Sequence, residues 1–531
     1  MTEEKETQKK IEIIENSLGR KFPSYIEGYG EVIPFQGAWS GIHLKKSASR
    51  VSLGTESRTQ DKMCSTLDEA LKKCKVFNGM TVSFHHHLRE GDGIVNMTMK
   101  ALKEMGVKGI KLAPSALFNV HSGLVDYLND GTIETILGSM NGSIGVQVSL
   151  GKMQGVGVLR SHGGRVRSIM QNDMHIDLAV IGAPTADNYG NANGIDGKSA
   201  CGPLAYSNID SKLADKVIIV TDNLVPYPAS PISISQINVD YVVEVESIGD
   251  PNKIVSGSLR IVRKEPLITI SNNTAAVVEH SGLMKEGFNF QAGAGSISLL
   301  TVERIGEMMK KTGVKAGWVN GGTTSLIIDL FRENYVKKVT TCQAFDLVSV
   351  ESLRKDKNHI EINIDEYANI CNKGCLVNLL DIVVLGATEV DVDFNVNVNT
   401  HSDGYLKHGI GGHQDTAAGA KLTIITVPLA RRDNPIIIDS VTTVTTPGEC
   451  IDVVVTEGGI AVNPLRPKLA KMLKEAGLPI MDIQELKELA EKTAGKAYVK
   501  PETKERIVAV IEWRDGSVID VVREVIPKEK K

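Results

Sequence analysis

Two stretches of the chain, 204 positions apart, repeat one pattern of apolar and polar residues. In each, a continuous apolar run is followed by a loop rich in Gly, Asn and Asp. Such a run is typical of a strand buried in a parallel sheet, and open α/β sheets bind their ligands at the carboxyl ends of such strands. Each copy is therefore predicted to contribute one loop to a site. The identical pairs are Asp177/Asp381, Gly182/Gly386, Ala183/Ala387, Asp187/Asp391, Asn191/Asn395 and Asn193/Asn397.

The segments upstream of these runs match more loosely. In each copy we expect a helix with short glycine turns, then a strand, then an amphipathic segment. Strands that alternate with helices build parallel sheets with crossover helices. The sequence therefore predicts an α/β protein of two tandem, doubly wound domains with mainly parallel sheets and an active site between them. The matched ranges are Leu102–Gly109 with Val302–Gly313, Ile110–Ala113 with Ala316–Asn320, and the segment ends Leu124–Asp126 with Ile327–Asp329.

The chain divides into an N-terminal arm and two domains. The expected parts are residues 1–45, 46–280 and 281–531. We expect the arm to be helical between Lys9 and Leu18. The tail is predicted to be helical and then to form a strand pair across a turn that contains Asp and Gly. The tail ranges are Pro467–Glu491 for the helix, Ile507–Ile511 and Val518–Val522 for the strands, and Arg514–Gly516 for the turn.

The composition excludes several classes of protein. Hydrophobic residues make up 42% and charged residues 23% of the 531 positions, and the formal net charge is −4. That charge offers no general attraction to nucleic acid or to an anionic membrane. No apolar run approaches the length of a spanning helix, and the charged segment Met1–Lys10 is no signal peptide, so we expect a cytoplasmic protein. Seven scattered cysteines favour reduced thiols, although the pair Cys371 and Cys375 leaves a zinc site open.

An ordered set of motifs carries a resemblance to a known family. The chain resembles the acyl-CoA transferases, and among them the citrate lyase alpha subunits, from about Met63 to Val525. The second copy also resembles the beta half of two-subunit CoA-transferases, through Gly411-Gly-His-Gln-Asp415 and Asp393–Asn397. The other segments that carry the resemblance are Gly79–His86, Ser161–Val166, Gly190–Gly194, Lys285–Phe288, Asn358–Ile362, Phe394–Val398, Ile460–Pro464 and Asp515–Val522.

The resemblance implies a reaction and a set of partners. A member of this family is a citrate CoA-transferase that converts acetyl-[acyl-carrier protein] and citrate into citryl-[acyl-carrier protein] and acetate. It works beside a beta subunit, the citryl lyase, and a gamma subunit, the acyl carrier protein. No cofactor is expected to be tightly bound, because the chain acts on acetyl-CoA or on the CoA-like prosthetic group of the carrier. We also expect a homo-oligomer.

One departure from the CoA-transferases bears on mechanism. Their catalytic glutamate lies in a Ser-Glu-Asn-Gly stretch, and the corresponding residues here, Thr341–Asp346, contain no glutamate. The resemblance to citrate lyase then implies a ternary complex, in which the incoming carboxylate attacks the acyl thioester and forms a mixed anhydride. The protein would supply positioning and oxyanion stabilisation without forming a covalent intermediate.

Glycine loops are the first candidates for binding. Their backbone N–H groups can stabilise an oxyanion, although a glycine can equally well serve only a turn. Arginines beside one such loop, Arg160, Arg165 and Arg167, are candidates for lining the route of the phosphorylated thiol. The candidate loop residues are Gly142, Gly145, His162, Gly163, Gly164, Gly293, Gly295, Gly321, Gly322, Thr323, Asn395, Asn397, Gly411, Gly412 and Asp415.

Histidines, one arginine and one glutamate complete the candidate set. His85, His86 and Arg89 are candidates for holding carboxylates, since guanidinium pairs with carboxylate through two parallel hydrogen bonds. Only His85 and His87 could share a metal, because neighbouring strand residues point to opposite faces, and we expect no metal. Glu389 is the candidate catalytic residue: it could orient substrate, act as a base or form an acyl adduct, and a solvated loop glutamate is the alternative.

Two other functions fit the same sequence. One is a stand-alone acyl-CoA:carboxylate CoA-transferase that uses free CoA and short-chain acids. The other is a non-catalytic scaffold subunit. Acetate release from an acetyl thioester in the presence of citrate separates these hypotheses.

Overall fold

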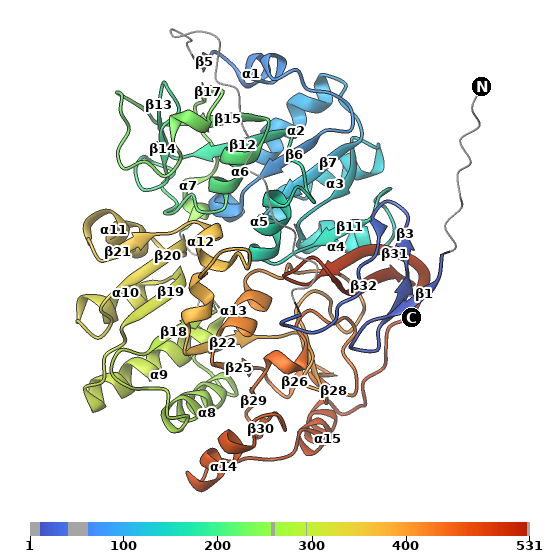
Figure 1. The fold of residues 1–531 in the computed structure, drawn as a ribbon, viewed down its shortest axis with the longest axis vertical. Helices are drawn as coiled ribbons and strands as arrows, with labels where there is room; N and C mark the ends of the chain where they lie inside the picture. Colours follow the sequence, from blue (N-terminus) through green and yellow to red (C-terminus); the bar gives the residue numbers. More distant parts are fainter. Residues whose placement is uncertain (1–10, 41–61, 256–260, 294, 528–531) are drawn as a thin grey trace.

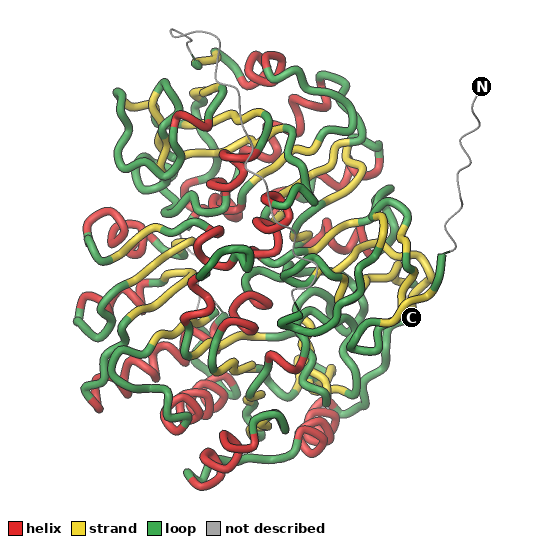
Figure 2. Tube along the Cα trace, in the orientation of Figure 1, coloured by secondary structure: helices red, strands yellow, loops and turns green. Residues whose placement is uncertain are grey.

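Two α/β units of similar design make up most of the molecule (Figure 1). The structure is a computed structural model that describes residues 11–40, 62–255, 261–293 and 295–527. Figure 2 shows the helices lying around two large sheets, one in each half of the molecule. Among the described residues, no helix has the length and apolar character needed to cross a bilayer.

The first sheet has seven strands, and every neighbouring pair is parallel. Its strands alternate with helices along the chain. In spatial order the strands are β5 (Met63–Cys64), β17 (Tyr241–Glu244), β15 (Lys216–Thr221), β12 (Leu178–Ala183), β6 (Thr81–Phe84), β7 (Ile110–Pro114) and β9 (Ile133–Ile136). The α-helices of this unit are α1 (Leu67–Lys73), α2 (Ile94–Glu104), α3 (Leu124–Asn129), α4 (Gly142–Ser149), α5 (His162–Met170), α6 (Ser207–Leu213) and α7 (Pro251–Ile254).

The second sheet has eight strands, and only its edge strand β30 runs antiparallel to its neighbour. In spatial order the strands are β21 (His359–Glu361), β20 (Val339–Ala344), β19 (Trp318–Thr323), β18 (Asn289–Ala292), β22 (Ile382–Gly386), β25 (Leu422–Thr426), β29 (Val453–Val455) and β30 (Ile460–Val462). The α-helices are α8 (Leu267–His280), α9 (Ser296–Thr312), α10 (Ser325–Arg332), α11 (Leu347–Lys355), α12 (Ile364–Ala368), α13 (His413–Gly419), α14 (Pro467–Glu475) and α15 (Ile483–Ala494).

These sheets confirm the predicted α/β class and the repeat. The two repeated apolar runs are β12 and β22, which occupy equivalent positions beside β6 and β18. The helix expected over Leu102–Gly109 ends earlier, at Glu104, and Gly106 follows it with a φ of 79°. The division of the domains at residue 280 stays a prediction, and helix α8, which precedes it, packs against α9, β25 and β29 of the second unit.

The prediction of a helix near the N-terminus is wrong over its described part, residues 11–18, while Lys9 and Lys10 lie outside the described residues. Strand β1 (Ile13–Glu15) pairs antiparallel with β2 (Lys21–Pro23) instead. The Asn16 side chain fixes the turn, because it accepts the backbone N–H groups of Leu18 and Arg20 and donates to the Ile519 carbonyl. Contacts with the end of the chain thus override local helix propensity.

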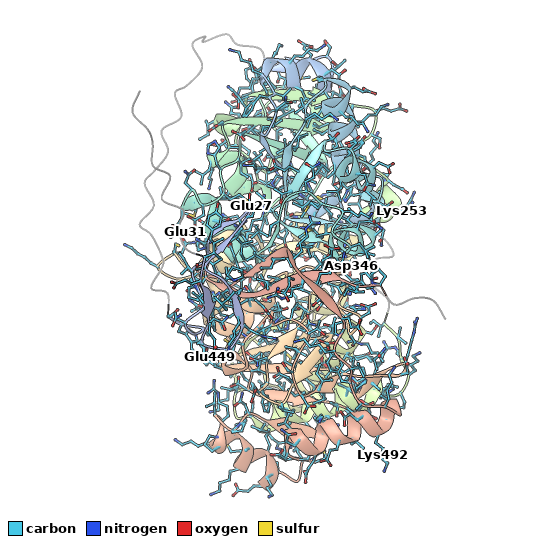
Figure 3. The ribbon with its side chains drawn as sticks, turned by 90° about the vertical axis from the view of Figure 1, so that its right-hand side faces the viewer. Glu27, Glu31, Lys253, Asp346, Glu449 and Lys492 are labelled. Atoms are coloured by element: carbon cyan, nitrogen blue, oxygen red, sulfur yellow. The ribbon has the colours of Figure 1, made fainter. Side chains whose placement is uncertain are left out.

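The C-terminal strand pair joins the two units. Strands β31 (Thr503–Glu512) and β32 (Val518–Val525) form the predicted antiparallel hairpin, and β31 also pairs with β11 (Gly157–Leu159) of the first unit. From the second unit, the Gln414 side chain donates to the Glu512 carbonyl at 3.0 Å. Figure 3 shows the hairpin crossing the middle of the molecule. The hairpin therefore helps to fix the two units relative to each other.

Candidate active site

Each large sheet has one point at which its strand order reverses. In the first sheet the chain runs from β6 through β7 to β9, and then from β12 through β15 to β17 in the other direction. In the second it runs from β18 to β21, and then from β22 through β25 to β29. Ligands of doubly wound sheets bind outside the carboxyl ends of the strands at this reversal. The candidate site is therefore expected after β6 and β12 in one unit and after β18 and β22 in the other.

A cluster of buried rings follows β6. The His86 ring lies 4.1 Å from the Tyr206 ring and 5.6 Å from the His162 ring, measured between centroids. The Tyr206 hydroxyl and His162 Nε2 are 3.2 Å apart. Burial lowers the pKa of His162 to about 4 and that of His86 well below its usual range. Both imidazoles are therefore neutral at pH 7 and can hydrogen-bond a substrate without repelling a cation.

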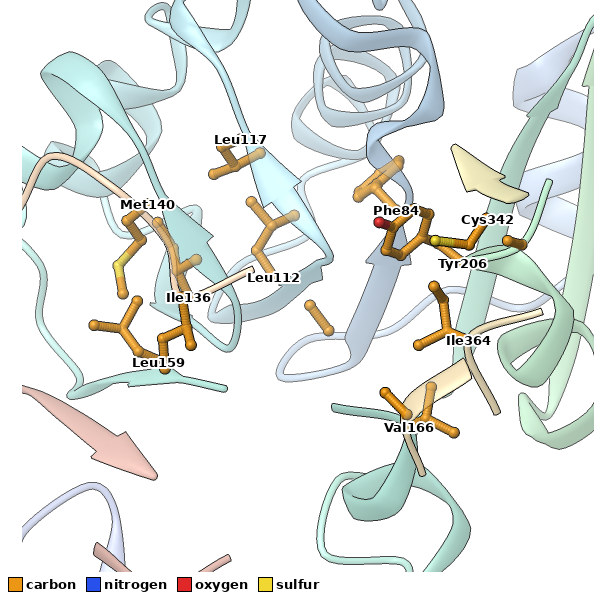
Figure 4. Packing of buried hydrophobic residues seen from close by; sticks show 14 of the residues in the cluster. Phe84, Leu112, Leu117, Ile136, Met140, Leu159, Val166, Tyr206, Cys342 and Ile364 are labelled. Carbon is orange, nitrogen blue, oxygen red and sulfur yellow. The ribbon is translucent and has the colours of Figure 1, made fainter. Parts of the chain in front are cut away.

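The second unit closes over this cluster. Tyr206 lies beside Cys342 on β20 (Figure 4). On β18, Gln291 Nε2 donates to the Tyr367 hydroxyl at 2.8 Å. The His162 backbone N–H donates to the Gly411 carbonyl at 2.9 Å. Rings from the first unit therefore lie next to polar groups from the second. The sequence predicts such an arrangement for an active site between the domains.

Arg89 places a positive charge beside the ring cluster. Its guanidinium lies 4.9 Å from the ring of Phe345, in the second unit, and 5.7 Å from the ring of Phe118. Its backbone is left-handed, with a φ of 52°, which is uncommon for a residue with a side chain. Among the described residues no carboxylate forms an ion pair with Arg89. A half-buried arginine held between two rings is suited to bind the carboxylate of a ligand.

Polar atoms without partners surround the carboxyl ends of the second sheet. Within the described part of the chain, Gln291 Oε1, Gln343 Nε2 and Thr324 Oγ1 are buried and form no hydrogen bond. An unpaired buried polar group is costly, and a ligand that pairs with it removes the cost. Sequence reasoning missed these residues, because Gln and Thr inside or beside a strand give no distinctive signal.

The end of β20 carries no free carboxylate in the described chain. Asp346, which ends the segment Thr341–Asp346, caps two helices: its Oδ2 accepts the Ser325 N–H at 2.6 Å and its Oδ1 accepts the Ser349 N–H at 2.8 Å. Its oxygens are therefore occupied by structural hydrogen bonds, as expected for an N-cap residue.

Two of the predicted glycines make room beside these groups. A side chain on Gly321, which has a φ of 99°, would lie 2.7 Å from the Gln291 side chain. One on Gly322 would lie 2.2 Å from the Phe345 ring. Thr323 accepts the Phe345 N–H through its carbonyl. Gly293 follows β18, and Gly295 is the N-cap of α9, so both lie at the same edge of the sheet.

Asp415 anchors the loops around the cluster. Its carboxylate accepts the Gly163 N–H at 3.0 Å, the Ser161 hydroxyl at 2.9 Å and Arg514 Nε at 3.2 Å. It is fully buried, and burial raises its pKa against the lowering effect of Arg514. Asp415 thus joins α5, α13 and the C-terminal turn. Gly164 donates its N–H to Ser161, and a side chain on Gly412 would lie 2.9 Å from the Tyr367 hydroxyl.

Other predicted residues lie in packing positions. A side chain on Gly145 would lie 2.3 Å from the Leu406 carbonyl, and Gly142 donates its N–H to the Lys407 carbonyl. Asn395 accepts the Gly448 N–H, and Asn397 donates to Glu389. These four residues hold the second unit together and against α4, and none of the contacts given above, within the described part of the chain, is with the ring cluster.

Glu389 is buried rather than solvated. It lies on the short strand β23 (Glu389–Asp391), and its carboxylate accepts three hydrogen bonds. The donors are Asn397 Nδ2 at 2.8 Å, the Thr442 N–H at 2.9 Å and the Thr442 hydroxyl at 3.0 Å. These bonds favour a structural role, and catalysis by Glu389 stays a prediction.

His85 and His87 face different partners. His85 Nε2 lies 3.4 Å from the Asp210 carboxylate, and His87 Nε2 lies 2.7 Å from the Gly182 carbonyl. The arginines beside α5 are likewise engaged. Arg160 pairs with Glu512, Arg165 with Asp210 and Arg167 with Asp173.

One group of possible metal ligands gave no signal in the sequence. Among the described residues, His175, Asp177 and Asp215 place one ligand atom each within 4.8 Å of one another. Asp177 and Asp215 precede β12 and β15, so the group lies at the sheet edge opposite to the ring cluster. Of the closely spaced cysteine pair, Cys371 is exposed whereas Cys375 is buried.

The fold is that of the CoA-transferases and their relatives. The structure resembles the alpha subunit of malonate decarboxylase from Acinetobacter baumannii, with a TM-score of 0.61 and 14% identity over 83% of this chain and 96% of that one. It also resembles 4-hydroxybutyrate CoA-transferase from Porphyromonas gingivalis, with a TM-score of 0.53 and 14% identity over 81% and 97% of the two chains. At these identities the likeness concerns the fold alone.

The chain belongs to the citrate lyase alpha subunit family, whose model, "Citrate lyase, alpha subunit (CitF)", matches residues 60–525. The citrate lyase alpha chain of Klebsiella pneumoniae is 43% identical over 475 residues, which cover 89% of this chain and 93% of that protein. That of Escherichia coli (strain K12) is 41% identical over 471 residues, 88% and 92% of the two. The alpha subunit of citrate lyase from Streptococcus mutans, solved in complex with citrate, has a TM-score of 0.91 and 44% identity over 97% and 100%. The predicted family and fold are confirmed.

Proposed function

We propose that this chain catalyses the transferase step of citrate lyase, in which acetyl-[acyl-carrier protein] and citrate give citryl-[acyl-carrier protein] and acetate. Membership of the citrate lyase alpha subunit family supports the substrates. The observation that carries the proposal in the structure is the ring cluster of His86, His162 and Tyr206, which meets Gln291 and Tyr367 of the second unit beside the unpaired Arg89.

The chemistry that we propose needs no nucleophile from the protein. A citrate carboxylate attacks the acetyl thioester carbonyl, and the thiolate leaves as a mixed anhydride forms. The thiolate then attacks the citryl carbonyl of the anhydride, and acetate leaves. Arg89 would hold a citrate carboxylate, while the neutral His86 and His162 would donate hydrogen bonds to the reacting oxygens. The Gly293 N–H already donates to the Val384 carbonyl, so the backbone N–H of Gly295, at the start of α9, is the proposed donor to the oxyanion.

The finer proposals concern partners and location. We propose that a beta subunit cleaves the citryl thioester and that a gamma subunit carries the CoA-like thiol. Tethering the thiol to a carrier raises its effective concentration at both active sites. We also propose a homo-oligomer in the cytoplasm.

Acetate release tests the proposal. The purified chain is incubated with labelled citrate and with an acetyl thioester, either on the acyl carrier protein or on free CoA. We expect fast release with the carrier and slower release with free CoA. Equal rates would favour the stand-alone transferase, and no release with either thiol would favour the scaffold.

A further inference from the structure

A basic pocket lies in the second unit, outside the ring cluster. Its volume is about 670 Å³. Its walls come from Thr388, residues 401–407, the hairpin of β26 (Ala430–Arg431) and β27 (Asn434–Pro435), and residues 496–499. Lys407, Arg431, Arg432 and Lys496 line it, with a single carboxylate, Asp403. The net charge of the chain is −4, so this concentration of positive charge is local.

Two of the four cations are left without a protein anion. Lys407 Nζ pairs with Asp403 at 3.0 Å, and Lys496 Nζ pairs with Asp433 at 2.6 Å. In the described part of the chain, no ion pair joins Arg431 or Arg432 to a carboxylate. The pocket thus keeps about two uncompensated positive charges on guanidinium groups, which bind phosphate oxygens through paired hydrogen bonds.

Two histidines beside the pocket also reflect this positive charge. His401 Nε2 and His408 Nε2 are 2.9 Å apart. Burial and the neighbouring His408 and Lys407 lower the pKa of His401 to about 4, and burial together with Arg431 and Lys407 lowers that of His408. Burial is the main cause of both shifts, and the nearby Lys407 and Arg431 add to it.

The pocket adjoins the strand end that borders the candidate site. Arg431 Nη2 donates to the Ala387 carbonyl at 2.6 Å, directly after β22. Lining residue Thr388 follows in the chain, and His413 Nε2 is 3.2 Å from the Gly386 carbonyl at the same strand end. A long ligand could therefore lie with one end in the pocket and the other at the carboxyl end of β22.

We propose that this pocket binds the phosphate groups of the CoA-type thiol while its acyl end reaches the ring cluster. The inference rests on the proposed function, because that function supplies a thiol with phosphates at its far end. A phosphate monoester carries a charge of about −1.5 to −2 at pH 7, which matches the two unpaired arginines. Arg160, Arg165 and Arg167, which the sequence indicated for this role, are already paired with carboxylates.

Direct binding of CoA, without turnover, tests the pocket. Calorimetry on the full chain measures the affinities of CoA, of pantetheine, which lacks phosphate, and of citrate. We expect Arg432→Gln to weaken CoA binding several-fold and Arg431→Gln with Arg432→Gln to weaken it at least tenfold. The affinities for pantetheine and citrate should not change. The matched control is Arg304→Gln, a half-buried arginine on α9 that is paired with Glu307 and lies outside the pocket lining.

Each other outcome overturns the proposal. Unchanged CoA affinity means that the phosphates bind elsewhere, and an equal loss for pantetheine means that the variants disturb the fold. A loss of citrate affinity alone would assign the pocket to a tricarboxylate. Among the described residues, the Arg432 side chain makes no hydrogen bond that would complicate its single variant, whereas Arg431 donates to the Ala387 carbonyl. Because binding is measured without acetyl transfer, failure of the pocket and failure of the proposed function give different results.

Discussion

One arginine presents an unpaired positive charge to the ring cluster. Arg89 is held between Phe118 and Phe345 by cation–π contacts, which fix its position without neutralising it. Its left-handed backbone places strain at the same residue. Strain of this kind persists only where the surrounding structure fixes the conformation, and such residues cluster at ligand-binding sites. Binding a carboxylate is a role that fits Arg89.

Arg89→Lys should therefore weaken citrate binding while keeping the charge. A lysine cannot form two parallel hydrogen bonds to a carboxylate, and losing one charge-assisted bond costs roughly 1.5–3 kcal/mol, about tenfold or more in affinity. We expect the KM for citrate to rise at least tenfold and the KM for the acetyl thioester to stay unchanged. Steady-state kinetics with each substrate varied check this. Arg304→Lys, a half-buried arginine on α9 that is paired with Glu307, is the control. An unchanged citrate KM would contradict the role of Arg89.

Glu389 differs from Arg89, because its carboxylate oxygens already accept hydrogen bonds within the protein. Glu389→Gln places an amide N–H₂ against the Thr442 or Asn397 donors, so one buried hydrogen bond is lost. We expect the free energy of unfolding to fall by roughly 1–3 kcal/mol and the turnover of folded enzyme to stay unchanged. Chemical denaturation and kcat on the same preparation decide the matter. A hundredfold fall in kcat at unchanged stability would support the catalytic prediction.

Buried neutral histidines should make stability depend on pH. His413 lies between Thr446 Oγ1 and the Gly386 carbonyl, and burial lowers its pKa to about 4. The unfolded chain takes up this proton near pH 6.5, so the stabilisation is complete above that pH and is lost as the pH falls towards 4. His413→Gln should reduce the loss of unfolding free energy between pH 7 and pH 5 by roughly 2 kcal/mol. Denaturant titrations at both pH values measure it, and the exposed His280→Gln should change nothing.

At the scale of elements, the sequence indicated the repeat well and the site only in part. The runs that became β12 and β22 are apolar throughout, and that pattern identifies a buried strand from local information. The ring cluster depends on contacts between residues far apart in the chain, such as His86 with Tyr206 and Gln291 with Tyr367. Because Tyr and Gln are common in cores and on surfaces alike, no local pattern singled them out.

The N-terminal arm shows the same limit. Local propensity suggested a helix, but Asn16 bonds to Ile519 and Phe35 packs edge-on against Trp513 at 5.5 Å. These contacts exist only once the two ends of the chain meet. A strand that is stabilised by a partner 500 residues away therefore cannot be recognised from its own sequence.

The C-terminal turn provides a test of how elements hold the site. Arg514→Ala would leave the fully buried Asp415 without its cation, which costs roughly 3–5 kcal/mol. We expect lower stability and also a lower kcat, since Asp415 fixes the Gly163 N–H beside the ring cluster. Denaturation and kinetics measure both effects. Arg523→Ala, at the far end of the same hairpin, is the control, and an unchanged kcat would show that the turn does not position the site.

At the scale of the whole molecule, the two units face each other. In the described chain, the end of β20 in the second unit offers no free carboxylate. Their arrangement suits two substrates that are bound together, with the acceptor carboxylate held at Arg89 while the thioester extends from the basic pocket past β22. Simultaneous binding is what the mixed-anhydride route requires, because the anhydride must be captured by the thiolate that has just left.

Initial rates should therefore follow a sequential pattern. When citrate and the acetyl thioester are varied together, double-reciprocal lines should intersect, and borohydride should trap no enzyme thioester, because Asp346 is already engaged by Ser325 and Ser349. A glutamate-dependent CoA-transferase, treated in parallel, provides the positive control for trapping. Parallel lines together with a trapped adduct would show that a carboxylate of the chain carries the CoA-type thiol as a thioester, and mapping that adduct to Glu389 or to another carboxylate would identify the nucleophile.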